Sequence, residues 1–277
     1  MPTLLTTPSA DARTDGMQPA AFDRRVRTEA ENLGRTDSGR LQRIFDIVLA
    51  AGALVVVSPL MLLIGVFIRL DSPGPILFRH VRIGRNRRGG EPTDRQREQR
   101  KRDDGGRPFV FYKFRTMYVD ARERFPHLYS YSYTQEELET LPIKVLVGKK
   151  GDPEDFREGP RPELMEDPRV TRVGRWLRKT SLDELPNFLN VLKGDMSLVG
   201  PRPDIAENIR YYRPSEMRKL SVKPGVTGLA QVRGRGFLPF HAINAYDVEY
   251  VDRRSLWLDV RILVETIFFV VKRHGAY

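Results

Sequence analysis

Residues 180–203, TSLDELPNFLNVLKGDMSLVGPRP, decide the interpretation of this chain because they place an acidic pair shortly before an arginine that stands between two prolines. Ser181 with Glu184 three positions later is the pattern of a capping box, which predicts that a helix begins here. Asp183 would then lie in the first turn, where the helix dipole favours an ionised carboxylate and also a phosphate beside it. Its carboxylate is a candidate nucleophile or metal ligand, although acidic residues in first turns also serve purely structural roles.

The same residues predict how this helix packs and how the turn after it is built. Apolar side chains recur at helical spacing and would form a buried stripe, at Leu182, Leu185, Phe188, Leu189 and Leu192. Arg202 stands between Pro201 and Pro203, and a residue that precedes proline is biased towards an extended conformation. A rigid backbone lowers the entropy that a guanidinium loses when it binds phosphate through two hydrogen bonds. Arg202 is therefore a candidate phosphate ligand.

The composition narrows the classes of partner and site. With 47 Lys and Arg against 36 Asp and Glu, the net charge of +11 favours anionic partners such as phospholipid, nucleotide or nucleic acid. The absence of cysteine excludes disulfides and thiolate metal sites, and the four histidines are too scattered to suggest a histidine-built zinc site. Charge alone would fit a basic nucleic-acid-binding protein. The long apolar segment predicts membrane association instead, so we expect no nucleic-acid partner.

That apolar segment covers residues 44–68, IFDIVLAAGALVVVSPLMLLIGVFI, in which Asp46 is the only charge. It is long enough to cross a bilayer. Ser58 and Pro59 fall near its middle, where proline removes a backbone donor and disfavours helical geometry in the residue before it, so we expect a break. Arginines flank both ends, which favours both ends in the cytoplasm. We predict a re-entrant membrane helix over residues 41–75; a kinked transmembrane helix and a buried core helix remain open.

Two short strands are predicted after this segment, over residues 76–84 and 109–117, because both runs are rich in aromatic and β-branched residues. Alternation along the second strand puts Lys113 and Arg115 on one face, which would form either a phosphate clamp or a basic surface that touches lipid headgroups. Arg178 ends a run of arginines spaced by three, which would share one helical face shortly before the acidic pair. A solvated face is the structural alternative for that run.

The last part of the chain contains a glycine-rich run and two expected helices. Residues 223–236, KPGVTGLAQVRGRG, combine four glycines with Gln231 and Arg233, which suits a backbone that approaches an anion, although the run matches neither the GxGxxG nor the Walker pattern. Residues 204–220 are predicted to form a polar helix. Residues 245–271 are amphipathic, and their second half suits either a helix on the membrane surface or an ordinary packed helix.

The order of these features resembles the bacterial sugar transferases called monotopic phosphoglycosyl transferases. The apolar segment with its Ser-Pro break is followed by KFRTM, TSLDELPN, GDMSLVGPRP and PGVTGLAQV, in an order and spacing that are highly specific. The resemblance covers the chain from Leu41 to its end. It implies an enzyme on the cytoplasmic face of the bacterial inner membrane, in contact with the membrane lipid, that begins the assembly of an exopolysaccharide, O-antigen or glycoconjugate.

In such an enzyme a nucleoside diphosphate sugar, usually with uridine, donates its sugar 1-phosphate to polyprenyl phosphate, such as undecaprenyl phosphate. The resemblance implies that Asp183 is the nucleophile that forms a covalent aspartyl intermediate, and that Glu184 and Asp183 hold Mg2+. Fixed positive charge would offset the repulsion between anionic substrates and a carboxylate. The candidate phosphate-binding residues are Lys113, Arg115, Arg178, Arg202, Gln231 and Arg233. A conventional glycosyltransferase and a catalytically inactive membrane-anchored scaffold are the alternatives.

Taken together, the sequence predicts an α+β protein that is mostly helical and monotopic, with a Pro-broken re-entrant membrane helix, a short β-hairpin and a membrane-apposed helical catalytic domain. Residues 1–40 are expected to be a disordered tail because they show little apolar periodicity. Residues 41–75 would be the re-entrant membrane helix and residues 76–277 a cytoplasmic catalytic domain, with insertions at about 85–107 and 118–166. The sequence is silent on oligomeric state, and a membrane-associated homodimer is compatible with it.

Overall fold

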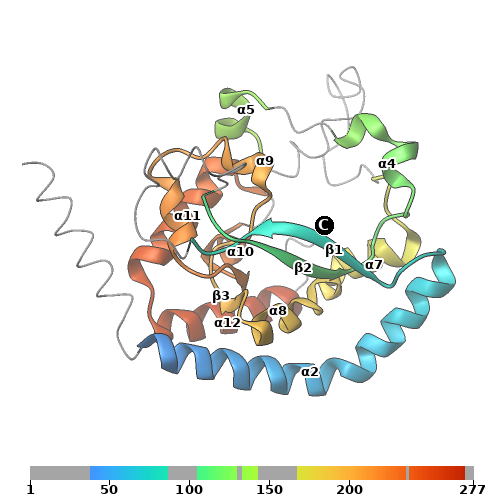
Figure 1. Ribbon diagram of the computed structural model, residues 1–277, viewed down its shortest axis with the longest axis horizontal. Helices are drawn as coiled ribbons and strands as arrows, with labels where there is room; N and C mark the ends of the chain where they lie inside the picture. Colours follow the sequence, from blue (N-terminus) through green and yellow to red (C-terminus); the bar gives the residue numbers. More distant parts are fainter. Residues whose placement is uncertain (1–37, 87–104, 130–132, 143–166, 235–236, 272–277) are drawn as a thin grey trace, which may run out of the picture. The chain divides into compact units, whose positions relative to one another are not determined.

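The computed structural model describes residues 38–86, 105–129, 133–142, 167–234 and 237–271. The expected tail lies outside these residues as far as position 37, whereas residues 38–40 belong to the first helix; most of the two expected insertions also lie outside. In chain order the elements are α2 (Ser38–Asp71), β1 (Leu77–Ile83), β2 (Pro108–Phe114), α4 (Ala121–Arg124), the 3-10 helix η1 (Pro126–Tyr129), α5 (Gln135–Thr140), α7 (Arg172–Thr180), the 3-10 helix η4 (Leu182–Glu184), α8 (Asn187–Lys193), β3 (Ser197–Val199), α9 (Ala206–Ile209), the 3-10 helix η5 (Glu216–Ser221), β4 (Gly225–Thr227), α10 (Leu229–Arg233), α11 (Phe240–Arg253) and α12 (Leu256–Val271) (Figure 1). The described part is mostly helical with two pairs of short strands, as expected for the predicted α+β class.

The apolar segment forms α2, a continuous helix that contains Pro59 and bends along its length (Figure 1). Pro59 has no N–H to donate to the carbonyl of Val55, one turn earlier, but the hydroxyl of Ser58 donates to that oxygen at 2.9 Å. The missing backbone hydrogen bond is thus replaced, and the helix is not interrupted. The expected break is therefore corrected: Ser58 and Pro59 lie within a helix that bends rather than ends.

Most of α2 is uncovered by the rest of the protein. Among the described residues it is the one helix long and apolar enough to cross a membrane, and only 11% of its most apolar 18-residue window is buried. Large apolar side chains protrude from it, among them Val55, Val56, Leu62 and Leu70, with exposed fractions between 75% and 79%. Contiguous exposed apolar surface indicates contact with a membrane and argues against the alternative of a buried core helix.

Both ends of α2 are nevertheless fixed to the rest of the protein by polar contacts. Near its start, Arg43 donates at 2.6 and 2.8 Å to two carbonyls near the C-terminal end of α8. Asp46 is buried and accepts hydrogen bonds from the hydroxyl of Ser197 at 2.7 Å and from a backbone N–H of β3 at 2.9 Å. At the other end, Arg115 donates at 2.7 Å to the carbonyl of Ser72. The lone charge of the apolar segment therefore joins α2 to β3.

β1 and β2 form an antiparallel hairpin, which confirms the two predicted strands. Their register pairs Phe78 with Lys113, so these side chains share one face of the hairpin. The side chain of Asn190 in α8 binds the backbone of β2 twice. It donates to a carbonyl at 2.6 Å and accepts from the N–H of Tyr112 at 3.2 Å. This contact fixes the position of β2 against α8 and therefore the position of Lys113, the next residue.

The segment around the acidic pair differs from the sequence-based prediction. α7 ends at Thr180, and Ser181 then adopts a left-handed conformation, with φ 58° and ψ 18°. The 3-10 turn η4 comes next and carries Asp183 and Glu184, and α8 begins only at Asn187. Ser181 makes no capping hydrogen bond through its side chain, so the predicted capping box is wrong. A left-handed residue ends a helix and redirects the chain, so the acidic pair lies on a corner between two helices.

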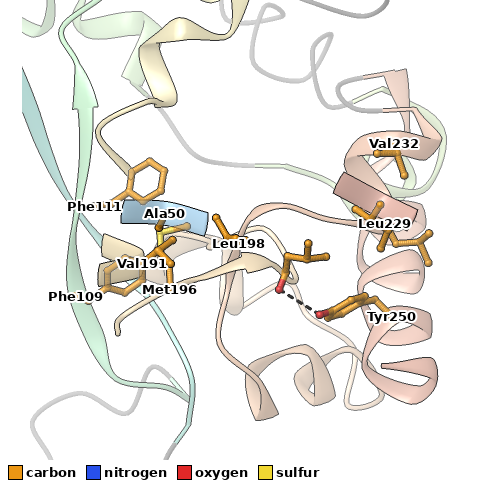
Figure 2. Close-up of a cluster of buried hydrophobic side chains, with 11 residues drawn as sticks. Ala50, Phe109, Phe111, Val191, Met196, Leu198, Leu229, Val232 and Tyr250 are labelled. Atoms are coloured by element: carbon orange, nitrogen blue, oxygen red, sulfur yellow. Dashed lines mark hydrogen bonds between the residues drawn. The ribbon is translucent and has the colours of Figure 1, made fainter. Parts of the chain in front are cut away.

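The main core lies between the hairpin, α8, β3 and the C-terminal helices (Figure 2). The hydroxyl of Tyr250 in α11 donates to the carbonyl of Val199 in β3 at 3.2 Å, as the dashed line in Figure 2 shows. The predicted apolar stripe is divided between two clusters. Phe188 and Leu192 pack against this core, whereas Leu182 and Leu185 pack against a smaller cluster that includes part of α2. The remaining member, Leu189, is exposed.

One prediction for the C-terminal part needs correction, and another is confirmed. Residues 204–220 are not one helix, because Pro214 and the restricted residue before it separate α9 from η5. The second half of the amphipathic stretch 245–271 forms α12, as expected, and the hydroxyl of Ser255 accepts from a backbone N–H in the first turn of α12 at 3.2 Å. In α12, Trp257 is 78% exposed and several other large apolar side chains protrude. These exposures favour the membrane-surface interpretation of α12 over an ordinary packed helix.

Candidate active site

The acidic pair meets two cations that lie far from it in the sequence. The ammonium of Lys113 is 2.6 Å from Oε1 of Glu184 and 3.4 Å from Oδ2 of Asp183. Nη2 of Arg202 is 3.3 Å from the same oxygen of Glu184. Asp183 is buried, whereas Glu184 and Arg202 remain partly exposed. The structure thus brings together four of the residues that the sequence singled out.

The glycine-rich run fixes the turn after β3, residues 200–203, which carries Arg202 and is called the arginine turn below. β4 lies parallel to β3, and the turn after β3 is tied to β4 by two backbone hydrogen bonds. The N–H of Gly200 donates to the carbonyl of Thr227, and the N–H of Gly225 donates to the carbonyl of Pro201, both at 2.9 Å. A side chain at Gly200 would begin 2.5 Å from a backbone oxygen of the neighbouring segment, so only glycine allows this approach. The glycine-rich run therefore fixes the position of the backbone that carries Arg202.

The electrostatics of the site centre on Asp183. Burial raises the pKa of its carboxyl, and Glu184 raises it as well, whereas Lys113, Arg178 and Arg202 lower it. The net pKa lies above the ordinary value for aspartate. The protein's own cations therefore do not fully offset the burial of this carboxylate, and a further cation beside it would favour the ionised form.

The acidic pair fits the requirements of Mg2+. Adjacent carboxylates supply the hard oxygen ligands that this ion prefers. In the described ranges no group of three or more acidic, histidine or cysteine side chains could hold a metal by itself. Mg2+ usually keeps several waters and shares one or two carboxylates with substrate phosphates, so Asp183 and Glu184 would suffice as the protein's contribution.

Arg178 approaches the site from α7 and is held by two residues that the sequence analysis did not single out. Its Nε donates to the hydroxyl of Thr116 at 3.0 Å, and its Nη1 is 3.7 Å from Oδ2 of Asp167. α7 can lie this close because Gly174 has no side chain: a Cβ there would be 2.1 Å from the carbonyl oxygen of Thr116. Thr116 and Asp167 gave no signal in the sequence because their relation to Arg178 depends on the packing of α7 against the end of β2.

Arg115 does not share the site with Lys113, which corrects the prediction from alternation. β2 ends at Phe114, so the alternating pattern does not continue to the next residue. Arg115 is buried, and its guanidinium donates to the carbonyls of Pro73 at 2.5 Å and Ser72 at 2.7 Å, just after α2. It therefore fixes the end of the apolar helix instead of facing the acidic pair.

The remaining two candidates lie on α10. The side chain of Gln231 is buried, and neither of its amide atoms has a hydrogen-bond partner within the part of the chain that the structure describes. Arg233 is exposed and lines a cavity of about 60 Å³ between α10, α11 and α12, together with Arg253 and Arg261. No ion pair between Arg233 and the acidic pair occurs among the described residues. A Cβ at Gly228 would lie 2.9 Å from Oε1 of Gln231 and 2.2 Å from the carbonyl oxygen of Gly200, so the side chain of Gln231 lies next to the turn that carries Arg202.

Comparisons of the sequence with known proteins agree on one family. Residues 38–273 match the sequence profile of bacterial sugar transferases. The chain is 38% identical over 246 residues to the undecaprenyl-phosphate galactose phosphotransferase of Salmonella typhimurium, covering 89% of this chain and 44% of that protein. It is 36% identical over 244 residues to the UDP-glucose:undecaprenyl-phosphate glucose-1-phosphate transferase of Caulobacter vibrioides, covering 85% of this chain and 72% of that protein.

A shorter relative matches along most of its own length. The exopolysaccharide production protein ExoY of Rhizobium meliloti is 33% identical over 244 residues, which cover 88% of this chain and 91% of that protein. By contrast, the chain spans less than half the length of the Salmonella relative and of several others. With a profile match over most of its length and a relative matched almost end to end, the chain belongs to the bacterial sugar transferase family.

Proposed function

We propose that the chain is a phosphoglycosyl transferase that moves a sugar 1-phosphate from a nucleoside diphosphate sugar, with uridine as the nucleoside, to polyprenyl phosphate. The products would be polyprenyl diphosphate sugar and nucleoside monophosphate. The names of two relatives describe a galactose phosphotransferase and a glucose-1-phosphate transferase that act on undecaprenyl phosphate, which supports this reaction class. The observation that carries the proposal is the convergence of Asp183, Glu184, Lys113 and Arg202 at one site.

The reaction would consist of two displacements at phosphorus. First, a carboxylate oxygen of Asp183 attacks the phosphorus that bears the sugar, the bond to the bridging oxygen breaks, and nucleoside monophosphate leaves. Next, an oxygen of the lipid phosphate attacks that phosphorus, the bond to Asp183 breaks, and the carboxylate is restored. With two steps, only one anionic substrate at a time must approach the carboxylate. The burial of Asp183 supports this mechanism because it limits the access of water to the intermediate.

The cations around the pair would have separate roles. Lys113 lies between the two carboxylates and would stabilise the charge that develops as Asp183 attacks. Arg202 and Arg178 would bind the donor's diphosphate from opposite parts of the chain. Mg2+ held by Asp183 and Glu184 would supply positive charge against the phosphate oxygens. Arg115 has no such role here, since its Nη1 and Nη2 donate to backbone carbonyls next to α2.

We also propose that α2 is re-entrant and that the domain lies on the cytoplasmic face of the inner membrane. The contacts at the two ends of α2 support this topology. Asp46 near the start binds β3, whereas Arg115 binds the end of α2 and directly follows β2, which Asn190 joins to α8. One folded unit holding both ends cannot lie on both sides of a bilayer. The exposed apolar side chains between those ends would then enter the lipid from one side, and the acidic pair would lie near the headgroups.

Single cysteines can test this topology, because the chain has none of its own. Thr28→Cys lies before α2, and Ser221→Cys lies at an exposed position after it. A membrane-impermeant thiol reagent applied to intact cells should label neither variant, and both should react once the inner membrane is opened. Labelling of Thr28→Cys alone in intact cells would contradict a re-entrant helix and would support the kinked transmembrane alternative.

The products separate the proposed reaction from its alternatives. The purified protein would be incubated in lipid with Mg2+, polyprenyl phosphate and a panel of UDP-sugars, and the released nucleotide identified. We expect nucleoside monophosphate together with a lipid-linked sugar diphosphate. A conventional glycosyltransferase would release nucleoside diphosphate, and an inactive membrane-anchored scaffold would release neither. Either of these outcomes would overturn the proposed function.

A further inference from the structure

A buried cluster of charged side chains around Lys219, with Asp204 and Asp247, lies next to the turn that carries Arg202. Asp204, two residues after Arg202, accepts a hydrogen bond from the hydroxyl of Tyr212 at 2.6 Å. Its backbone carbonyl accepts from the N–H of Ile83, at the end of β1, at 2.8 Å. Because Pro203 allows little rotation between them, fixing Asp204 also restricts the backbone of Arg202.

Lys219 connects Asp204 to a second carboxylate, on α11. Lys219 is buried in η5, and its Nζ lies 2.8 Å from Oδ2 of Asp247 and 3.6 Å from Oδ2 of Asp204. The same ammonium donates to the side-chain oxygen of Asn244 at 2.9 Å. Burial raises the pKa of Asp247, whereas Lys219 and, more weakly, the nearby backbone N–H of Arg202 lower it. Lys219 thus links a carboxylate within the turn to another that faces the backbone of the turn.

Stability alone is a weak reason for such a cluster. Removing each charge from water is costly, and a protein in which well-packed apolar groups replace a buried ion pair is often no less stable. Breaking only one partner, however, leaves an unpaired buried charge, so the arrangement tolerates few alternative positions. A buried charged cluster therefore suits a place where a backbone must stay in one position.

Arg202 is the side chain at the site for which a fixed backbone matters most, because more of it is exposed than of the other charged side chains there. Arg202 is 41% exposed along its side chain and reaches Glu184 over 3.3 Å. Ordering a long, partly exposed guanidinium costs conformational entropy, which an exposed ion pair offsets only in part. Restricting its backbone removes part of that cost before substrate arrives.

We infer that Lys219, acting through Asp204 and Asp247, is a positioning residue that holds the arginine turn so that Arg202 meets Glu184 and the diphosphate of the donor. The inference rests on the proposed function and adds to it a residue that does not touch substrate. Lys219 is buried behind the turn, and its effect passes through Arg202.

A double-mutant cycle tests whether Lys219 acts through Arg202. The wild type, Lys219→Met, Arg202→Ala and the double variant would be assayed for kcat and KM with the UDP-sugar. We expect Lys219→Met to lower kcat/KM about tenfold or more when Arg202 is present, and less than about threefold in the Arg202→Ala background. Equal losses in both backgrounds would show that Lys219 acts on stability alone and would overturn the inference.

A matched control separates positioning from general loss of stability. Ile64→Ala creates a cavity in a buried cluster on α2 that shares no residue with the one around Lys219, and it should lower kcat/KM by the same factor in both backgrounds. Asp204→Asn keeps the size of the side chain and enters the same cycle. If Lys219→Met yields no folded protein, Asp204→Asn takes its place in the cycle, because it weakens the ion pair with Lys219 and leaves a side chain of the same size.

Direct binding of UDP distinguishes failure of the inference from failure of the proposed function. UDP affinity would be measured by calorimetry on the same four proteins. A wild type that releases no nucleoside monophosphate would overturn the proposed function, while a nonadditive cycle in UDP affinity would still support positioning of Arg202. A wild type that is active, with an additive cycle in both affinity and kcat/KM, would overturn the inference alone.

Discussion

The acidic-pair site and the cluster around Lys219 use the same kinds of side chain in opposite ways. At the site, the side chains of Lys113, Glu184 and Arg202 keep exposed fractions of 18%, 22% and 41%, although they are close to one another. In the cluster, the side chains of Lys219 and Asp247 are 2% and 1% exposed and lie 2.8 Å apart. The site therefore remains accessible to an incoming anion, whereas the cluster is closed to one.

Exposure and existing partners, rather than residue type, therefore distinguish a charged side chain that can bind substrate from one that stabilises the fold. Arg115 and Arg202 were both predicted to bind phosphate. Arg115 is buried, and both terminal nitrogens of its guanidinium donate to backbone carbonyls next to α2. Arg202 keeps much of its side chain exposed beside Glu184. Variants at the acidic-pair site should therefore lose activity, whereas variants of buried charges such as Arg115 should lose stability.

The largest effect is expected at the nucleophile. Asp183→Asn keeps the size of the side chain but removes the negative charge that attacks phosphorus. We expect kcat to fall on the order of 10⁴-fold or more, as is typical when a covalent nucleophile is lost. Mass spectrometry of the protein after incubation with donor alone should find a phosphosugar adduct on the wild type and none on the variant.

Asp195→Asn is the matched control, because it removes a carboxylate from the same motif region at a position with no proposed role. Its turnover should stay close to that of the wild type. Substantial turnover by Asp183→Asn, or an adduct on another residue, would remove Asp183 from the mechanism and with it the central contrast between the two clusters.

A smaller effect is expected at Lys113, and it should depend on pH. Burial raises the pKa of Asp183, and Lys113 is the strongest group that lowers it. The attacking form is the carboxylate, so activity is present above the pKa and is lost as the pH falls through it. Lys113→Met should lower kcat about 10²- to 10³-fold and move the acidic limb of the pH profile to higher pH. Kinetics measured across the acidic range would report both changes.

Lys193→Met supplies the control for this experiment. Lys193 donates to the hydroxyl of Tyr112, the residue before Lys113 in β2, and is itself exposed. Its removal should leave the acidic limb where it is. An unchanged limb in Lys113→Met would mean that the ammonium does not stabilise the ionised nucleophile, and Lys113 would then belong with the structural charges.

The sequence predicted those features of the site that depend on local pattern. Aromatic and β-branched runs marked both strands of the hairpin, and alternation placed Lys113 on one face of β2. The two prolines around Arg202 marked a rigid turn. The same reasoning failed one step beyond the strand, at Arg115, because the periodic pattern holds only while the strand lasts.

Other features could not be predicted because their cause is distant in the chain. Ser181 and Glu184 have the spacing of a capping box, yet Ser181 is left-handed and Glu184 binds Lys113 instead. An acid in an apolar helix gave no hint that Asp46 would bind β3, about 150 positions later. Partners at such separations are brought together by tertiary packing, which overrides local propensity. The cluster around Lys219 was missed for the same reason.

The smallest effect on activity is expected at Arg115, where the comparison predicts a loss of stability. Arg115→Met removes hydrogen bonds to buried carbonyls after α2 and should lower the free energy of unfolding by about 2–4 kcal/mol. The folded fraction should keep kcat/KM within about threefold of wild type, because no substrate contact is lost. Arg202→Met should show the opposite pattern, with little change in stability because its ion pair is exposed. Denaturant unfolding and steady-state kinetics on both variants would decide. If Arg115→Met lost affinity for the donor at unchanged stability, burial would no longer distinguish the two arginines. The prediction that Lys113 and Arg115 bind phosphate together would then be correct after all.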